Sequence, residues 1–209
     1  MTSNGQLYIV SAPSGAGKTS LVNRLIQELD SVHVAVSHTT RPKRPGETDG
    51  ESYHFVSRDE FQEIVDSGGF LEFAEVFSNL YGTSKAAVDE IVTTGTDVIL
   101  EIDWQGAQQV RKLRADALSI FIAPPSLQAL SERLSKRGQD SDEVIKGRLQ
   151  EAVRDIAHHD EFDYLVFNDE FEKALADLIA VVTSQRLRIA RQKVSQASRL
   201  AELLSSRAV

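Results

Sequence analysis

The sequence of 209 residues predicts an α/β fold with a parallel five-stranded sheet flanked by helices. Two observations carry this prediction: short apolar segments recur along the chain, and helical patterns fill most of the intervals between them. Because a parallel sheet is covered on both faces, its strands are apolar throughout. The expected strands are Leu7–Ser11, His33–Ser37, Asp97–Asp103, Leu118–Ile122 and Tyr164–Phe167.

The first expected strand runs directly into a glycine-rich segment that ends in Gly-Lys-Thr. Leu21, Val22 and Leu25 then recur at helical spacing, so strand, loop and helix follow in the order of a phosphate-binding P-loop. In such a loop, backbone N–H groups converge on phosphate oxygens at the positive end of the helix. We therefore expect a nucleoside triphosphate to bind at Ala12, Pro13, Ser14, Gly15, Ala16, Gly17, Lys18 and Thr19.

Within this loop we expect Lys18 to reach the β- and γ-phosphates and the Thr19 hydroxyl to hold Mg²⁺. Ala12 stands where the general motif begins with glycine. Pro13 follows it, and a residue before proline is restricted to extended backbone with negative φ. Alanine adopts that conformation without strain, so the departure leaves the predicted phosphate site intact.

Two segments interrupt the regular alternation and are predicted to be insertions. Residues 37–95 combine a Pro/Gly-rich turn, an extended stretch at Tyr53–Val56, a short helix and a half-buried strand at Phe70–Phe77. Residues 126–161 are charged and helical with a break at 137–141, and few apolar residues could anchor them to a core. We predict that they form a mobile lid.

The expected organisation is thus a single domain, residues 1–209, whose core comprises 5–36, 96–125 and 162–209. The last stretch, from Glu170 to about Ser205, is expected to be a long helix that is broken once if at all.

A basic segment, residues 39–47, follows the second expected strand. Its prolines exclude a helix and place Arg41 and Arg44 on extended or turning backbone. Two guanidinium groups can grip one phosphate bidentately, and a solvated basic loop is the alternative. Its position directly after a core strand of a P-loop protein favours the phosphate site.

Two acids end the third expected strand. Period-two alternation places Glu101 and Asp103 on the same side, at the sheet edge where ligand crevices form. An acid at this edge would hold Mg²⁺ directly or through water. Which of the two dominates stays open.

The predicted lid carries a second set of cations. Arg133 and Arg137 are four residues apart and therefore share a helix face, and Arg148 follows further along. A solvated helix face is the ordinary reading of that spacing, but over a triphosphate these groups would neutralise developing charge. The five histidines show no metal-ligand spacing, and no Ser/His/Asp pattern is present. A phosphate acceptor needs no general base because its oxygen is already anionic, so the pattern favours a nucleotide-to-nucleotide kinase.

Composition narrows the remaining classes. A formal net charge of −8 argues against nucleic acid as a general partner, and the absence of cysteine excludes disulfides and thiolate metal sites. Residues 1–6 are polar, and no apolar run approaches the roughly 20 residues that span a bilayer. We expect a cytoplasmic protein without membrane contact. Homo-oligomerisation stays open.

Taken together, five segments make the chain resemble the guanylate kinase family. They are residues 11–19, 36–47, 79–84, 101–106 and 137–141, in the family's order. The resemblance implies the reaction ATP + GMP ⇌ ADP + GDP in purine nucleotide metabolism, with Mg²⁺ as the cofactor. It also implies that residues 37–95 bind GMP and that the lid closes over both substrates.

The resemblance further implies roles for individual residues. Arg41, Arg44, Tyr53 and Tyr81 would hold the GMP phosphate, and Ser37, Glu72, Thr83 and Asp103 would read guanine. Lys18, Arg41, Arg133, Arg137 and Arg148 would be the catalytic residues, Thr19 and Glu101 would hold Mg²⁺, and Asn168 and Asp169 would lie near adenine. Guanine presents N1–H and N2 amino donors that suit a carboxylate at Glu72, whereas adenine would present a lone pair there.

Three positions depart from the family pattern. Glu101 stands where many relatives have Asp, Leu80 replaces a frequent Tyr, and Thr83 stands where some relatives have Ser. Two other functions stay open: a related kinase for another phosphorylated acceptor, and a guanylate-kinase-like interaction module without catalysis. Such modules typically lose P-loop residues, whereas Gly17, Lys18 and Thr19 are all present.

Overall fold

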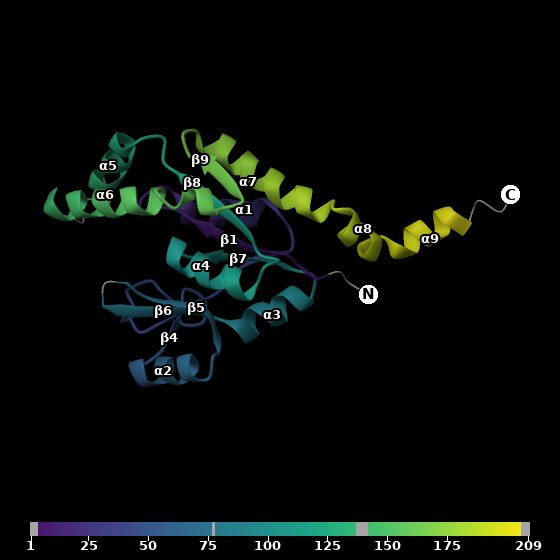
Figure 1. The fold of residues 1–209 in the computed structure, drawn as a ribbon, viewed down its shortest axis with the longest axis horizontal. Helices are drawn as coiled ribbons and strands as arrows, with labels where there is room; N and C mark the ends of the chain where they lie inside the picture. Colours follow the sequence, from purple (N-terminus) through teal and green to yellow (C-terminus); the bar gives the residue numbers. More distant parts are fainter. Residues whose placement is uncertain (1–3, 77, 137–141, 206–209) are drawn as a thin grey trace.

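The computed structural model describes residues 4–76, 78–136 and 142–205 (Figure 1). Its larger sheet has five strands, all paired in parallel, in the order β2-β7-β1-β8-β9. The strands are β1 (Leu7–Ser11), β2 (Val32–Val34), β7 (Asp97–Glu101), β8 (Leu118–Ala123) and β9 (Tyr164–Phe167). The predicted parallel five-stranded sheet is therefore confirmed.

Two strands end earlier than the sequence predicted. The Ala35 N–H still donates to the Ile99 carbonyl at 2.9 Å, but the Ser37 carbonyl already accepts from His54 N–H of the second sheet. The expected strand His33–Ser37 was therefore wrong at its carboxyl end. Similarly, β7 stops at Glu101, because Asp103 caps the following helix instead of continuing the ladder.

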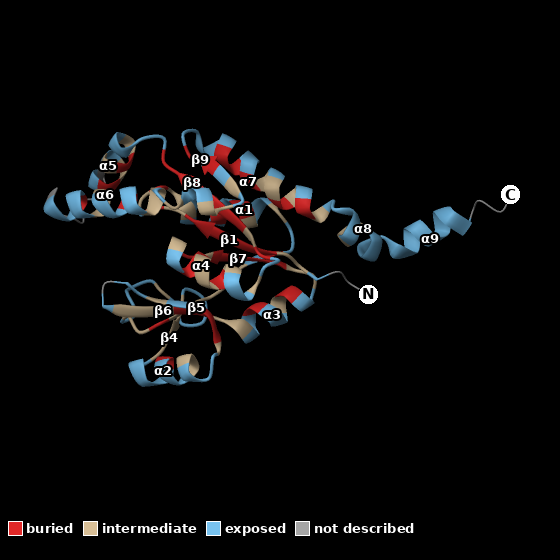
Figure 2. Cartoon of the chain, in the orientation of Figure 1, coloured by how far each residue is buried: buried red, intermediate tan, exposed pale blue. Residues whose placement is uncertain are grey.

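Alternate residues of β1 face two separate cores. Tyr8 and Val10 pack with α1 (Lys18–Glu28) and α7 (Phe171–Arg186) on one face of the sheet. Leu7 and Ile9 pack with α3 (Lys85–Thr93) and α4 (Trp104–Leu113) on the other. Figures 1 and 2 show this layering, with the buried strands in the middle. Burial on both faces is the reason that β1 is apolar without a polar alternation.

A smaller mixed sheet lies beside this core, in the order β4-β3-β6-β5 (Figure 1). Its strands are β3 (His38–Thr39), β4 (His54–Phe55), β5 (Phe70–Val76) and β6 (Asn79–Ser84). Helix α2 (Arg58–Asp66) begins with a capping box formed by Ser57 and Glu60 and buries Phe61 fully against Phe70, with ring centroids 4.6 Å apart. The sheet lies within the predicted insertion 37–95; the boundaries drawn from the sequence stay a prediction.

Three helical segments form the region predicted to be a lid: α5 (Leu127–Lys136), α6 (Asp142–Ile156) and the 3₁₀ turn η1 (His159–Glu161). The expectation that few apolar residues anchor this region was wrong. Leu130, Leu134, Ile145 and Ala152 are buried together. A Cβ added at Gly15 would lie 2.9 Å from Leu134 Cδ2, so α5 packs directly on the P-loop. Movement of the lid stays a prediction.

The carboxyl-terminal stretch is interrupted twice, between α7 and α8 (Ile189–Ser195) and between α8 and α9 (Ala197–Ser205). The expected long helix with one break at most was therefore wrong. Figure 1 shows α8 and α9 extending away from the rest of the chain. Within the described parts of the chain, no helix is both long and apolar enough to cross a membrane.

Candidate active site

The loop between β1 and α1 leaves the first turn of α1 open to a ligand. Gly17 precedes the helix with φ 96° and ψ 14°, and no side chain caps the free N–H groups. Gly15 has φ 89°, so both glycines occupy backbone that other residues rarely adopt. Ser31 and Ser78 are the only non-glycine residues with positive φ in the described ranges, so Ala12 is unstrained, as the sequence predicted.

The far side of the same loop is held by two side chains that contact its backbone. Asn168 Nδ2 donates to the Ala16 carbonyl at 2.7 Å, and Arg133 Nη1 donates to that carbonyl at 3.2 Å. Arg133 Nη2 also donates to the Asn168 carbonyl at 3.0 Å. A Cβ on Gly17 would lie 2.4 Å from Asn168 Nδ2, which leaves no room for a side chain. Arg133 and Asn168 thus position the loop; direct contact of Arg133 with a transferring phosphate stays a prediction.

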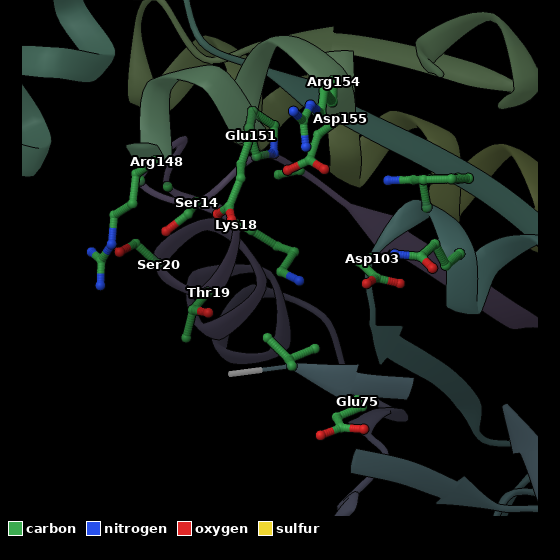
Figure 3. A pocket seen from close by; sticks show the side chains of 17 residues that line it. Ser14, Lys18, Thr19, Ser20, Glu75, Asp103, Arg148, Glu151, Arg154 and Asp155 are labelled. Atoms are coloured by element: carbon green, nitrogen blue, oxygen red, sulfur yellow. The ribbon is translucent and has the colours of Figure 1, made fainter. Parts of the chain in front are cut away.

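A cavity of about 680 Å³ opens in front of the loop (Figure 3). The P-loop, the start of α4, the end of β5 and the lid helix α6 all contribute to its walls. The residues that line it are Ala12, Pro13, Ser14, Gly15, Gly17, Lys18, Thr19, Ser20, Glu75, Val76, Asp103, Trp104, Gln105, Arg148, Glu151, Arg154 and Asp155. The predicted triphosphate residues and the lid cation Arg148 therefore border one space.

Lys18 and the predicted magnesium ligands lie together on this wall. Burial lowers the pKa of Lys18, while the nearby carboxylates of Glu101 and Asp103 oppose that shift. The Thr19 hydroxyl donates to Glu101 Oε2 at 2.8 Å. A hydroxyl and one carboxylate suit a hard cation that takes its remaining ligands from phosphate and water. Among the described residues, no group of three or more His, Cys, Asp and Glu side chains forms a metal site.

Three lining residues of the lid were missed by the sequence analysis: Glu151, Arg154 and Asp155. Burial raises the pKa of Asp155 to about 6, and the charges of Asp103 and Glu151 add to the shift. The lid therefore brings both acids and cations to the cavity. A signal was available, because Arg148, Glu151 and Asp155 recur at positions that share one helix face.

An aromatic stack connects the end of the lid to the start of α4. The rings of Trp104 and His158 lie 3.6 Å apart between centroids, with 8° between their planes. His158 Nδ1 lies 2.6 Å from Glu161 Oε1, and Arg111 Nη2 lies 3.0 Å from Glu161 Oε2. His158 was expected at the surface; it is half-buried and contacts the back of a cavity residue. The stack links lid position to the cavity wall.

Three of the predicted guanine-reading residues form one buried cluster in the smaller sheet. Thr83 Oγ1 donates to Glu72 Oε1 at 2.7 Å, and Ser37 Oγ lies 3.1 Å from Thr83 Oγ1. Glu72 is 5% exposed. Burial raises the pKa of the Glu72 carboxyl to about 7, and the hydrogen bond from Thr83 opposes part of this shift. A buried carboxyl poised near neutrality suits a ligand that supplies N–H donors.

Asp103 connects this cluster to the cavity. Its Oδ1 accepts from the Gly106 N–H at 2.8 Å and so caps α4. A Cβ on Gly106 would lie 3.0 Å from Glu72 Oε2, so a glycine permits the close approach of α4 to Glu72. Asp103 thus belongs to the cavity wall and, through the start of α4, lies beside the acceptor cluster.

The predicted phosphate clamp is paired with an acid inside its own loop. Arg41 Nη2 and Nη1 donate to Glu47 Oε1 and Oε2 at 2.7 and 3.1 Å, and the guanidinium lies 5.5 Å from the Tyr53 ring centroid. The Glu47 carboxylate, helped by Tyr81, raises the pKa of Arg41. The Tyr53 and Tyr81 rings lie 5.9 Å apart. The sequence analysis quoted Glu47 without assigning this role.

The remaining predicted residues are less closely gathered. Arg44 is exposed, and its backbone N–H donates to Glu47 Oε2 at 2.7 Å. Asp169 is exposed, and its Oδ1 accepts from the Glu170 N–H at 2.9 Å. Arg137 lies outside the described residues. Their assigned contacts with GMP, adenine and the transferring phosphate stay predictions.

Comparisons with known proteins agree with this arrangement. The family model for guanylate kinase matches residues 4–185. The chain is 60% identical over 202 residues to a guanylate kinase of Hahella chejuensis, covering 97% of both chains. It is 57% identical over 200 residues to one of Alkalilimnicola ehrlichii, covering 96% of this chain and 98% of the relative.

A solved structure gives the same result at the level of the fold. The crystal structure of guanylate kinase from Anaplasma phagocytophilum superposes with a TM-score of 0.74 at 31% identity, covering 91% of this chain and 90% of that one. The P-loop cavity, the buried carboxyl cluster and these likenesses lead to one conclusion: the chain belongs to the guanylate kinase family.

Proposed function

We propose that the protein transfers the γ-phosphoryl group of ATP to the phosphate of GMP, yielding ADP and GDP. The observation that carries this proposal is the buried Glu72–Thr83 pair beside the P-loop cavity, because it joins a purine-reading carboxyl to a triphosphate site. The names of the relatives support the same reaction.

On the donor side, the N–H groups at the start of α1 and the Lys18 ammonium would bind the β- and γ-phosphates. Thr19 and Glu101 would hold Mg²⁺, which would neutralise charge on the ATP phosphates when bound. Arg148 reaches the same cavity from the lid and would stabilise charge on the transferring group. These groups bind and orient, and none of them needs to move a proton.

On the acceptor side, Arg41 would exchange part of its pairing with Glu47 for the GMP phosphate. Arg44, Tyr53 and Tyr81 complete the proposed phosphate site. Glu72 would accept from guanine N1–H and the N2 amino group, with Ser37, Thr83 and Asp103 around it. The acceptor oxygen is anionic already, so alignment and charge neutralisation supply most of the catalysis.

Two other functions make different demands on these residues. A kinase for another phosphorylated acceptor would not need a buried carboxyl at Glu72, since that group would then lack its N–H donors. A non-catalytic interaction module would not need the open helix terminus at Gly17 or the Thr19–Glu101 pair. The geometry favours catalysis on a guanine nucleotide. A cytoplasmic location stays a prediction.

A coupled assay of ADP release tests the proposal with GMP, AMP, CMP and UMP as acceptors and ATP and Mg²⁺ in excess. We expect kcat/KM for GMP to exceed that for AMP by at least about 10⁴-fold, because a buried unpaired carboxyl rejects adenine. Comparable rates with AMP would contradict the guanine assignment. GMP binding by titration with no turnover would instead favour the interaction module.

A further inference from the structure

The residues after α7 form an arm, residues 187–205, that has no buried contact with its own chain. Neither α8 nor α9 contains a buried residue. Figures 1 and 2 show both helices projecting from the molecule and exposed along their length. The arm nevertheless carries large apolar side chains at Leu187, Ile189, Val194, Leu200, Leu203 and Leu204. Contiguous exposed apolar groups of this kind indicate an interaction surface.

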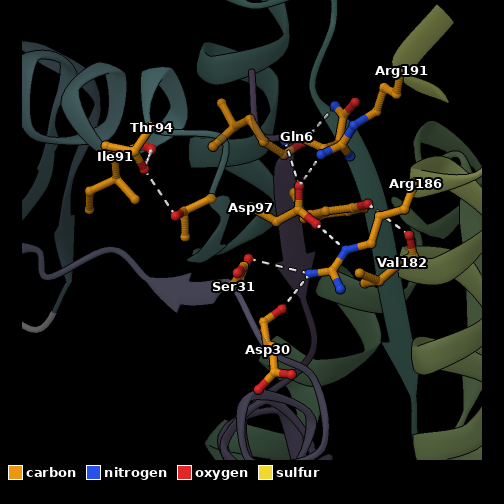
Figure 4. Close-up of polar contacts among 12 residues, drawn as sticks. Gln6, Asp30, Ser31, Ile91, Thr94, Asp97, Val182, Arg186 and Arg191 are labelled. Atoms are coloured by element: carbon orange, nitrogen blue, oxygen red, sulfur yellow. Dashed lines mark hydrogen bonds and ion pairs between the residues drawn. The ribbon is translucent and has the colours of Figure 1, made fainter. Parts of the chain in front are cut away.

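The base of the arm is fixed, so the arm is held in one direction as it leaves the core. Arg186 Nε and Arg191 Nη2 contact the two oxygens of Asp97 at 2.8 and 3.0 Å, and Asp97 is 1% exposed (Figure 4). Arg186 Nη2 also donates to the Asp30 carbonyl at 2.7 Å. Gln192 Nε2 donates to the Arg186 carbonyl at 2.9 Å. A pre-oriented arm loses less conformational entropy on binding a partner.

The charge of the arm is opposite to that of the remaining chain. Residues 187–209 contain five Lys and Arg and one acid, a net charge of +4, which leaves −12 on residues 1–186 out of the total of −8. Pairing of two arms with each other would bring like charges together. Docking of an arm on the body of another copy brings opposite charges together, which also favours the encounter.

One segment of the body combines exposed apolar groups with acids and has no cation. Residues 165–172 expose Leu165, Phe167 and Phe171, and the same eight residues carry Asp169, Glu170 and Glu172 but no Lys or Arg. We call this segment the acidic edge. It includes most of β9, an edge strand of the five-stranded sheet, and the start of α7.

Helix α7 joins the two surfaces, because the acidic edge lies at its amino end and the arm leaves its carboxyl end. We propose that the arm docks on the acidic edge of a second copy of this chain, in a two-fold symmetric dimer. Antiparallel α7 helices would let each arm reach the other copy's edge, so the contact closes upon itself. This proposal is independent of the phosphoryl-transfer reaction.

Sedimentation equilibrium of the full chain tests the dimer and its charge dependence. We expect a dimer whose dissociation constant rises when salt increases from about 0.1 M to about 0.5 M, because opposite charges at the rim are screened. A monomer at all concentrations up to about 100 μM would overturn the proposal. A dimer that tightens with salt would also overturn it, in favour of apolar pairing between arms. Binding of the monomer to anionic lipid vesicles would contradict it as well.

Variants locate the contact on both surfaces. Leu203→Asp with Leu204→Asp in the arm should raise the dimer dissociation constant about 100-fold, the scale of losing a buried apolar anchor. Leu113→Asp is the matched control, because Leu113 is 55% exposed at the end of α4, outside both surfaces, and should leave the dimer unchanged. An arm variant that dimerises like the control would overturn the proposal.

The edge variant carries Glu170→Lys with Glu172→Lys and should also weaken the dimer. A mixture of arm variant and edge variant keeps one intact arm–edge contact, so it should associate more tightly than either variant alone. An edge variant that dimerises like the wild type would overturn docking at the acidic edge. Circular dichroism and thermal melting of each variant separate loss of contact from loss of fold.

Discussion

The donor side and the acceptor side of the site differ in how their charged groups are held. At the P-loop, Asn168 and Arg133 fix the Ala16 carbonyl from behind, so the N–H groups and Lys18 face the cavity ready for phosphate. In the smaller sheet, Arg41 is paired with Glu47, and burial raises the pKa of Glu72 to about 7. The donor side is organised before ligand binds, whereas the acceptor side must exchange internal pairs for contacts with its ligand.

The difference has a physical origin. A phosphate binds to backbone N–H groups whose direction is set by the fold, and these groups cannot neutralise each other. Guanidinium and carboxyl side chains can, and they lower their free energy by pairing when no ligand is present. We therefore expect substitutions on the donor side to lower kcat and those on the acceptor side to change mainly the dependence on GMP.

The largest effect is expected for Lys18→Ala. Loss of a fixed cation beside the β- and γ-phosphates should lower kcat by about 10²- to 10³-fold, the scale for removal of one preorganised charge. Steady-state assays with both substrates saturating measure it. Lys173→Ala, an exposed lysine of α7, is the matched control. Turnover of Lys18→Ala within threefold of wild type would refute the donor assignment.

Glu72→Gln should act on GMP alone. The amide retains one acceptor but turns an N–H donor toward a guanine donor, so kcat/KM for GMP should fall about 100-fold, in the range of a hydrogen bond to a charged group. The KM for ATP should stay unchanged, because Glu72 does not line the donor cavity. A matched rise in the KM for ATP would show that the two sides are not separate.

The pH dependence of the acceptor side follows from the pKa of Glu72, about 7 in the protein without ligand. Below that pH the carboxyl is protonated and cannot accept two N–H donors, so the KM for GMP should rise about tenfold from pH 7 to pH 6 and level off above pH 8. The GMP phosphate also titrates near pH 6. Glu72→Gln keeps that contribution and loses the carboxyl step, and equal profiles for both proteins would contradict the assignment.

The smallest effect is expected for Glu47→Gln. Gln keeps one acceptor for Arg41 but removes the charge that orients the guanidinium and the Arg44 backbone. We expect the KM for GMP to rise about three- to fivefold with kcat unchanged, the signature of lost ground-state binding. Glu51→Gln, an exposed acid nearby in the same loop region, is the control. A KM that falls would mean that Glu47 competes with the phosphate more than it positions the clamp.

The sequence alone determined the features that depend on local order. The five strands, the P-loop and its tolerance of Ala12 follow from apolar runs, glycine positions and the proline at position 13. The pairing of Thr19 with Glu101 also followed, because parallel strands present their carboxyl ends at one sheet edge. These are short-range rules, and they hold here without knowledge of distant contacts.

Only the tertiary structure decided the features that depend on contacts between distant segments. Arg133 contacts the P-loop backbone, and Leu130 and Leu134 pack the lid against Gly15, because α5 folds over a loop more than 100 residues earlier. The pKa of Glu72 depends on burial under α4, and the two breaks that direct the arm away depend on the anchoring of Arg186 and Arg191 at Asp97. Burial and charge pairing are properties of the assembled fold, so the spacing of residues along the chain could not supply them.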